Sequence, residues 1–221
     1  MSYSATKEAH TPAQLITASA TLGHRGGERF MHCHGAWLDA RGKLRAGHLW
    51  PETRVGGVPI YAVIHRLPGV DLHNAVDSET RMPAFTPRPS SVSAPGHDAP
   101  TRRAVISRVK PGEELLAAAS DVCREHGFRH AEIRASLGSI VGARLRQGER
   151  VVDIDGPATE VVTVSGTLRV LGDDRLDCEL STILVDRHGV VHAGRLVSGH
   201  NLVAVTFELF IAEEHGVSSH G

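Results

Sequence analysis

The chain of 221 residues has few cysteines, few aromatic side chains and no excess of either charge. Cys33, Cys123 and Cys178 are too few and too scattered for a disulfide framework, so we expect a reducing, cytoplasmic compartment. Lysine plus arginine (24) balances aspartate plus glutamate (25), which gives no general attraction to nucleic acid. No apolar run could span a bilayer, and residues 1–12 lack the apolar core of a signal peptide, so no membrane partner is expected.

Several sequence motifs are missing as well. The chain has no Walker loop, no dinucleotide-binding glycine pattern, no nucleophile elbow and no paired Cys-x-x-Cys motif. It also lacks the Arg-Gly-Arg-Pro core of an AT-hook, which argues against DNA as a partner. The residue that stands out instead is histidine, with 15 copies.

Three of these histidines fall in residues 30–49, which read as two strands joined by a tight turn. The turn, residues 39–43, suits a three-residue hairpin loop in which Gly42 takes a positive φ. This loop sets the strand register, with His34 opposite His48 and His32 diagonal to His48. Because strand side chains alternate between faces, the pattern places all three imidazoles on one face.

This arrangement predicts a metal site. Opposed Cβ atoms lie about 5 Å apart and diagonal ones about 7 to 8 Å apart. Three imidazoles at such spacing can reach one ion at about 2.0 to 2.1 Å and leave a fourth position open. Imidazole suits zinc first, and iron, nickel or copper as alternatives. Three ordinary histidines on a sheet surface are the competing interpretation.

The same hairpin recurs later in the chain. Residues 30–49 align without gaps to residues 177–196, residues 16–22 resemble 162–168, and residues 55–64 align to 202–211. A repeat this long indicates two copies of a domain. In the second copy His32, His34 and His48 are replaced by Glu179, Ser181 and Arg195. Arg195 either pairs with Glu179 or binds a carboxylate or phosphate of a substrate.

Several short motifs resemble those of the PPC (plants and prokaryotes conserved) domain. In the second copy these are Val109-Lys-Pro-Gly-Glu-Glu-Leu115, Ala135-Ser-Leu-Gly-Ser-Ile140, Glu160-Val-Val-Thr-Val-Ser-Gly-Thr-Leu168, Gly194-Arg-Leu196 and Thr206-Phe-Glu-Leu209. In the first copy, His32-Cys-His34 and Gly47-His48-Leu49 resemble the histidine pair and the Gly-Gly-His-Leu signature of prokaryotic members, with Ala46 in place of the first glycine.

The resemblance implies an α/β fold of the α+β type, with a mostly antiparallel sheet covered by a helix, in two related copies. It also implies a homotrimer and a zinc site at His32, His34 and His48. The first copy lacks a counterpart of residues 108–148 and is therefore incomplete. DNA binding in plant relatives is associated with their AT-hooks and does not transfer on fold alone.

The expected layout has five parts. A flexible N-terminus (1–12) precedes the first, partial copy (13–82), a proline-rich linker (83–103), the second domain (104–213) and a flexible tail (214–221). Within the first copy we expect strands at 14–22, in the histidine hairpin and at 55–65, followed by an irregular stretch over 67–85. In the second domain the pattern predicts a strand at 104–109 and a helix that Gly127 ends.

Three functions stay open. The first is a metal-dependent enzyme, a hydrolase or lyase, acting on a small polar or carboxylate-bearing molecule, with Glu52 as the nearest candidate base. The second is a non-catalytic protein in which the metal orders the fold or a ligand site. The third is a DNA-binding regulator, which the family suggests but the charge balance does not.

Overall fold

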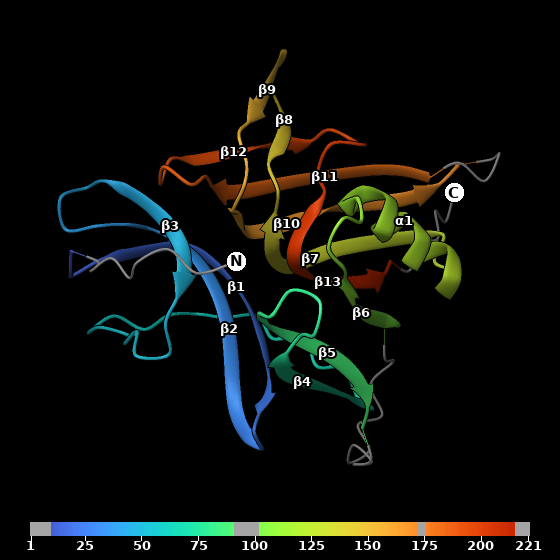
Figure 1. Cartoon of the computed structure of the whole chain (residues 1–221), viewed down its shortest axis with the longest axis horizontal. Helices are drawn as coiled ribbons and strands as arrows, with labels where there is room; N and C mark the ends of the chain where they lie inside the picture. The colour runs from blue at the N-terminus through green and yellow to red at the C-terminus, as the bar shows by residue number, and fades with distance from the viewer. Residues whose placement is uncertain (1–9, 91–101, 172–175, 215–221) are drawn as a thin grey trace, which may run out of the picture.

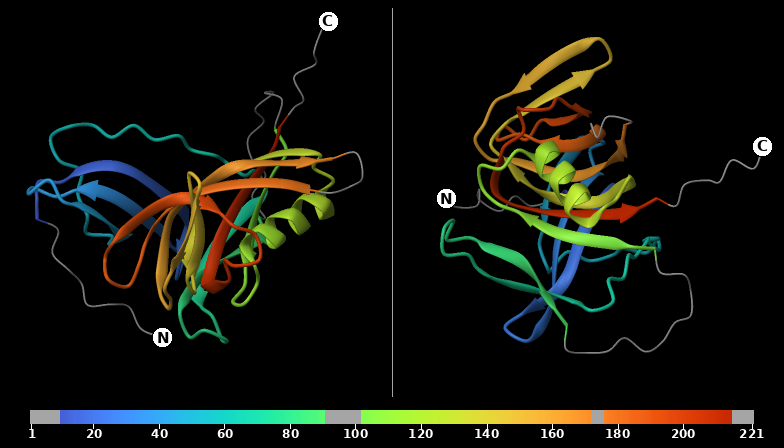
Figure 2. Two further views of the ribbon diagram at one scale, coloured as in Figure 1. Left: turned by 90° about the horizontal axis from the view of Figure 1, so that it is seen from above. Right: turned by 90° about the vertical axis from the view of Figure 1, so that its right-hand side faces the viewer.

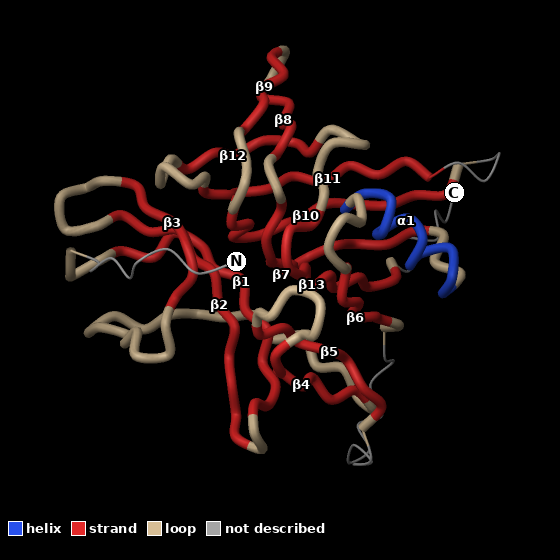
Figure 3. Tube along the Cα trace, viewed as in Figure 1, coloured by secondary structure: helices blue, strands red, loops and turns tan. Residues whose placement is uncertain are grey.

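The structure, a computed structural model, describes residues 10–90, 102–171 and 176–214 (Figure 1). Within these residues the chain forms two β-sheets and a single α-helix. Figure 3 shows where the strands, the helix and the loops lie along the chain. The α+β fold with a mostly antiparallel sheet is confirmed. No helix in the described part of the chain is long and apolar enough to cross a membrane.

The first sheet has five strands in the order β3-β2-β1-β4-β5. They are β1 (Gln14–Arg25), β2 (Glu28–Leu38), β3 (Leu44–Leu49), β4 (Val70–Val76) and β5 (Pro83–Pro89). The β2–β3 hairpin closes as predicted, because the Asp39 N–H donates to the Lys43 carbonyl and Gly42 takes a φ of 72°. His34 lies opposite His48, so the predicted register is confirmed.

The second sheet has eight strands in the order β6-β13-β7-β10-β11-β12-β8-β9. They are β6 (Ala104–Val109), β7 (His130–Ile140), β8 (Ala143–Gln147), β9 (Arg150–Ile154), β10 (Thr159–Val170), β11 (Leu176–Val185), β12 (Val191–Leu196) and β13 (Val203–Glu213). Helix α1 (Leu115–His126) covers this sheet; Glu114 caps its start and Gly127, at a φ of 67°, ends it. The main hydrophobic core, which includes Leu115, Ile133 and Phe207, belongs to this half.

The internal duplication is visible in the strand pairing. Strands β1, β2 and β3 follow one another with the same antiparallel pairing as β10, β11 and β12. The turn repeats, since the Asp186 N–H donates to the Val190 carbonyl and Gly189 has a φ of 78°. A register shift also recurs at the aligned place, between Leu15 and Thr17 in β1 and between Val161 and Thr163 in β10. Such bulges are specific local features, so their recurrence supports the duplication.

The expected strand over residues 55–65 is wrong. This segment is irregular and exposed, with Tyr61 at 96% and Val63 at 81% of their full exposure. Its counterpart in the second copy falls largely within β13, which is held between β6 and β7. The first copy has no counterpart of those two strands. The backbone of residues 55–65 therefore has no neighbouring strands with which to form hydrogen bonds.

Residues 83–89, expected as the start of a linker, form β5 and pair antiparallel with β4. Residues 67–85, expected to be irregular, contain β4 and the β4–β5 turn. Proline is tolerated in β5 because β5 is an edge strand, where an N–H on the outer side has no neighbouring strand to bond. Residues 91–101, most of the rest of that linker, lie outside the described part of the chain, as do 1–9 and 215–221.

The two sheets meet face to face. Strands β1, β2 and β3 contact β10, and β3 also contacts β11 and β12, as the two views of Figure 2 allow the reader to follow. The face that the first sheet turns toward this contact is polar, because Ser19, Thr21 and His34 are buried on it. Burying polar side chains without hydrogen bonds is unfavourable, which draws attention to the partners of this face.

Candidate metal centre

The histidine cluster, defined here as His32, His34 and His48, is brought together as the sequence predicted. One ligand atom from each ring lies within 4.8 Å of those from the other two. The ring centroids are 4.7 Å apart for His32 and His34, 5.0 Å for His32 and His48, and 5.3 Å for His34 and His48. His34 is only 1% exposed, whereas the other two rings are partly exposed. Solvent therefore reaches one side of the cluster.

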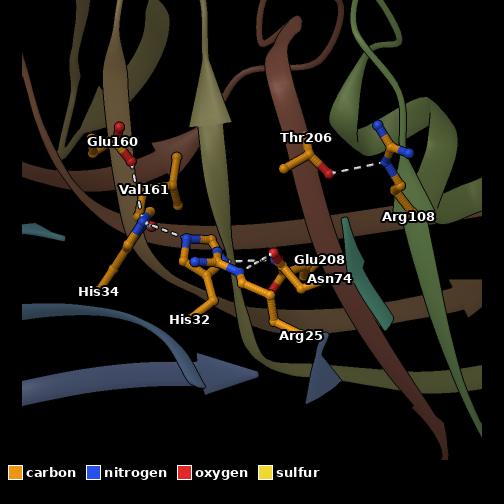
Figure 4. Close-up of polar contacts among 9 residues, drawn as sticks. All are labelled: Arg25, His32, His34, Asn74, Arg108, Glu160, Val161, Thr206 and Glu208. Atoms are coloured by element: carbon orange, nitrogen blue, oxygen red, sulfur yellow. Dashed lines mark hydrogen bonds and ion pairs between the residues drawn. The ribbon is translucent and has the colours of Figure 1, made fainter. Parts of the chain in front are cut away.

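The hydrogen-bond partners of two of these rings come from the second sheet. His34 Nδ1 donates to the backbone carbonyl of Val161 at 2.7 Å, and His32 Nδ1 lies 2.8 Å from Glu208 Oε1 (Figure 4). Val161 sits at the register shift of β10 with both neighbouring strands, where a carbonyl can leave the regular ladder. Glu208 comes from β13, where it lies between the apolar residues Phe207 and Leu209.

These bonds set the orientation of the rings. A carbonyl can only accept, so His34 Nδ1 carries the hydrogen, and the lone pair of the neutral ring lies on Nε2. His32 Nε2 is 3.0 Å from His34 Nε2, and Glu160 Oε2 is 3.2 Å from the same atom. A proton held by either group can be donated to the His34 lone pair. Both rings therefore direct Nε2 toward the centre of the cluster.

Burial and neighbouring charges give the three histidines different protonation states. Burial lowers the pKa of His34 to about 3, and the neighbouring charge of His32 acts in the same direction. Burial also lowers the pKa of His48 to about 3, with further contributions from His34 and His32. Both rings are therefore neutral at physiological pH, which is the state that can bind a metal.

His32 and Glu160 behave differently. Burial lowers the pKa of His32, but the charge of Glu208 and the hydrogen bond to it outweigh burial, and the pKa ends above 6.5. Burial raises the pKa of Glu160 to about 7, against a smaller opposing effect of His32. The Glu160 side chain keeps 32% of its exposure, so it can still exchange protons with solvent. A carboxyl that titrates near neutrality is suited to proton transfer.

The other two predicted site residues, Glu52 and Arg195, are not bonded to His32 or His34 in the described part of the chain. Glu52 is exposed in the turn that follows β3, and no hydrogen bond or ion pair joins it to His32 or His34. Arg195 donates to Glu179 Oε1 at 2.6 Å, and both side chains are about half exposed. In the second copy this ion pair takes the place of the histidine cluster.

Sequence reasoning missed Glu160 and Glu208 as members of the site. One signal was available for Glu208, which is a lone charged residue within the apolar run of β13 and is only 3% exposed. A charged side chain in such a run needs a buried partner. The identity of the partner depends on how two distant sheets pack, which local patterns do not reveal.

The chain belongs to a known family. A model of the Plants and Prokaryotes Conserved (PCC) domain matches residues 97–215, which is more than half of the chain. The resemblance inferred from the short motifs is therefore confirmed, and the matched residues correspond closely to the second copy. No curated protein matches the chain.

Solved structures similar to this chain come from bacteria and archaea. A hypothetical protein from Salmonella enterica is 28% identical, with a TM-score of 0.45, over 53% of this chain and 82% of that one. A plant- and prokaryote-conserved protein from Pyrococcus horikoshii is 25% identical, with a TM-score of 0.44, over 52% and 80%. A metal-containing protein from Archaeoglobus fulgidus is 20% identical, with a TM-score of 0.42, over 50% and 79%.

Proposed function

We propose that the chain binds one divalent transition metal, zinc first, through His32, His34 and His48. The observation that carries the proposal is the pair of bonds from His32 to Glu208 and from His34 to Val161. Histidine ligands of metals regularly donate their second ring hydrogen to a carboxylate or a backbone carbonyl, which fixes the ring and its tautomer. Here both kinds of partner are present, and both come from the second sheet.

The distances within the cluster fit such an ion. Four ligands at about 2.0 to 2.1 Å in a tetrahedron lie about 3.3 Å from one another. The two Nε2 atoms of His32 and His34 are 3.0 Å apart, and the third ligand atom lies within 4.8 Å of both. Small side-chain rotations therefore suffice. The all-imidazole donor set suits zinc, with iron, nickel or copper as alternatives.

An enzymatic role would use the open coordination position. A bound ion of this type would polarise a carbonyl or lower the pKa of a water molecule. Among the residues of this chain, Glu160 is a better acid–base candidate than Glu52, because its Oε2 is 3.2 Å from His34 Nε2. In the metal-free protein, burial raises its pKa to about 7. A cation bound at the histidines would lower that pKa and leave a carboxylate that can act as a base. A hydrolase or lyase acting on a small polar or carboxylate-bearing molecule fits these residues.

A non-catalytic role is the second candidate. The three histidines belong to the first sheet, whereas Glu208 and Val161 belong to the second, so a metal would also clamp the two sheets together. His48→Ala separates the two roles, because His48 is a partly exposed ligand whose loss disturbs the core less than the loss of the buried His34. An enzyme would lose turnover and keep its fold, whereas a structural site would lose stability.

We also infer self-association, with a trimer as the expected state from the family resemblance. The exposed apolar side chains of residues 55–64 support it, because six large apolar residues within ten positions are exposed. Large exposed apolar patches commonly mark interaction surfaces.

Metal analysis of protein purified without an affinity tag tests the proposal. We expect about one metal ion per chain in the wild type and none in the His32→Ala/His34→Ala variant. Because His34 is buried, His48→Ala provides a second variant at a partly exposed ring. His24→Ala is the matched control, since His24 is an exposed histidine of β1 whose ring contacts His73. An equal loss in the control would point to surface binding and would contradict the proposal.

A further inference from the structure

A cationic side chain lies on the same sheet face as the histidine cluster. Strand β1 buries Ser19 and Thr21 against the second sheet, whereas Leu22, with the opposite side-chain direction, is 58% exposed. Because strand side chains alternate, Arg25 shares the face of Ser19 and Thr21. In the pairing of β1 with β2, Thr21 lies opposite His32 and Arg25 lies opposite Glu28. Arg25 therefore lies at the end of β1, four residues along the strand from the residue that faces His32.

Two contacts fix the guanidinium of Arg25. Its Nε donates to Asn74 Oδ1 at 2.8 Å, and its Cζ lies 3.5 Å from the centre of the Phe30 ring. Asn74 is buried, and Phe30 shares the face of His32 two residues earlier in β2. Cation–π stacking and a hydrogen bond to a buried amide hold a planar group in one orientation. Arg25, Asn74 and His32 are drawn together in Figure 4.

The remaining donors of Arg25 are available. Within residues 10–90, 102–171 and 176–214 the hydrogen bonds of Arg25 use Nε alone, and no ion pair joins its guanidinium to a carboxylate. Arg25 is also exposed to solvent. The charge of Arg25 also acts on the cluster. The pKa of His48 is lowered mainly by burial, and Arg25 lowers it further. A fixed guanidinium with a free outer edge is suited to binding a carboxylate with two parallel hydrogen bonds.

We propose that Arg25 is the substrate-recognition residue of this site and that it binds the carboxylate of a small molecule whose second polar group reaches the histidine-bound metal. This inference rests on the proposed metal function, since it names the substrate class of the same site. Arg25 would select for molecules with an anionic end, and the metal would take the opposite end. Asn74 and Phe30 act as positioning residues, because they hold the guanidinium.

Calorimetric titration of the zinc-loaded protein with succinate tests this assignment. Arg25→Met should weaken succinate binding at least about tenfold, because a charge-assisted hydrogen-bond pair is lost. Zinc content should stay equal to that of the wild type. Arg29→Met is the matched control, since Arg29 is an exposed arginine of β2 with the opposite side-chain direction. Its succinate affinity should equal that of the wild type.

The outcomes separate the two proposals. A wild-type protein that takes up no metal overturns the proposed function itself. Normal zinc content with equal succinate affinity in wild type and Arg25→Met overturns only the role of Arg25. Inorganic phosphate forms a second arm of the experiment. If Arg25→Met weakens phosphate binding and leaves succinate binding unchanged, the carboxylate assignment is wrong.

Discussion

His32 Nδ1 lies 2.8 Å from Glu208 Oε1, although the two residues are 176 positions apart and belong to different sheets. The first sheet carries the histidines, and the second sheet orients them. The second copy therefore supports the histidine cluster of the first copy. It has lost the three histidines but provides the carboxylate and carbonyl that hold two of them.

Glu208→Gln should weaken metal binding about tenfold to a hundredfold, because it removes the negative charge beside His32 while keeping the side-chain shape. The measurement is competition for zinc against a chromophoric chelator. Glu179→Gln is the matched control, since Glu179 pairs with Arg195 at the aligned place of the second copy. Unchanged zinc affinity in Glu208→Gln would remove the orienting role of Glu208.

The stability of the metal-free protein should fall as pH rises and Glu160 loses its proton. Its pKa of about 7 lies above its ordinary value of 4.5, so the folded state holds the proton more tightly than the unfolded state. Its ionisation therefore destabilises the fold, and stability falls as pH rises from 4.5 to 7. Glu160→Gln removes this effect. Relative to wild type, the variant should gain about 1 to 2 kcal/mol between pH 4.5 and pH 8, after allowance for solvent screening.

Urea unfolding of both proteins at several pH values, with chelator present, measures this difference. A stability difference between the two proteins that stays constant with pH would show that Glu160 titrates as an ordinary carboxyl.

Metal uptake should release few protons. At pH 6 the rings of His34 and His48, with pKa values of about 3, are already neutral, whereas His32 is protonated. In the Glu160→Gln background we therefore expect about one proton released per zinc. Three histidines with ordinary pKa values would release about two. Calorimetry in buffers of different ionisation enthalpy counts these protons, and a count near two would mean that the rings are not buried as described.

The hairpin register could be predicted from sequence because it depends on local chemistry. Asp39 and Gly42 define the loop, and the loop then fixes which histidines oppose one another. The duplication could also be predicted, because the two copies align in sequence. The structure agrees, since the aligned turn at Asp186 and Gly189 has the same hydrogen bonds.

Two features could not be predicted from the sequence. Residues 55–65 have a strand-like apolar pattern, yet a strand also needs neighbours, and the first copy lacks counterparts of β6 and β7. Glu160 and Glu208 join the site only because two sheets pack face to face. Such long-range contacts leave no periodic trace in the sequence.

The exposed segment gives a separate prediction about assembly. Replacing Val58 and Val63 by serine should lower the oligomeric state measured by light scattering, because both side chains are exposed and apolar. The circular dichroism spectrum should stay unchanged, since neither residue contributes to the core. Val151→Ser, at an exposed position of β9, is the control. An oligomer of unchanged size in the double variant would exclude this segment from the interface.

The most direct test of the central claim is an anomalous difference map from crystals of zinc-loaded protein, recorded at the zinc absorption edge. We predict a single strong peak per chain about 2.0 to 2.1 Å from a ring nitrogen of each of His32, His34 and His48. Glu208 and Val161 should still accept from the outer nitrogens of His32 and His34. A map with no peak at the histidine cluster, or with zinc bound only at surface histidines, would contradict the account.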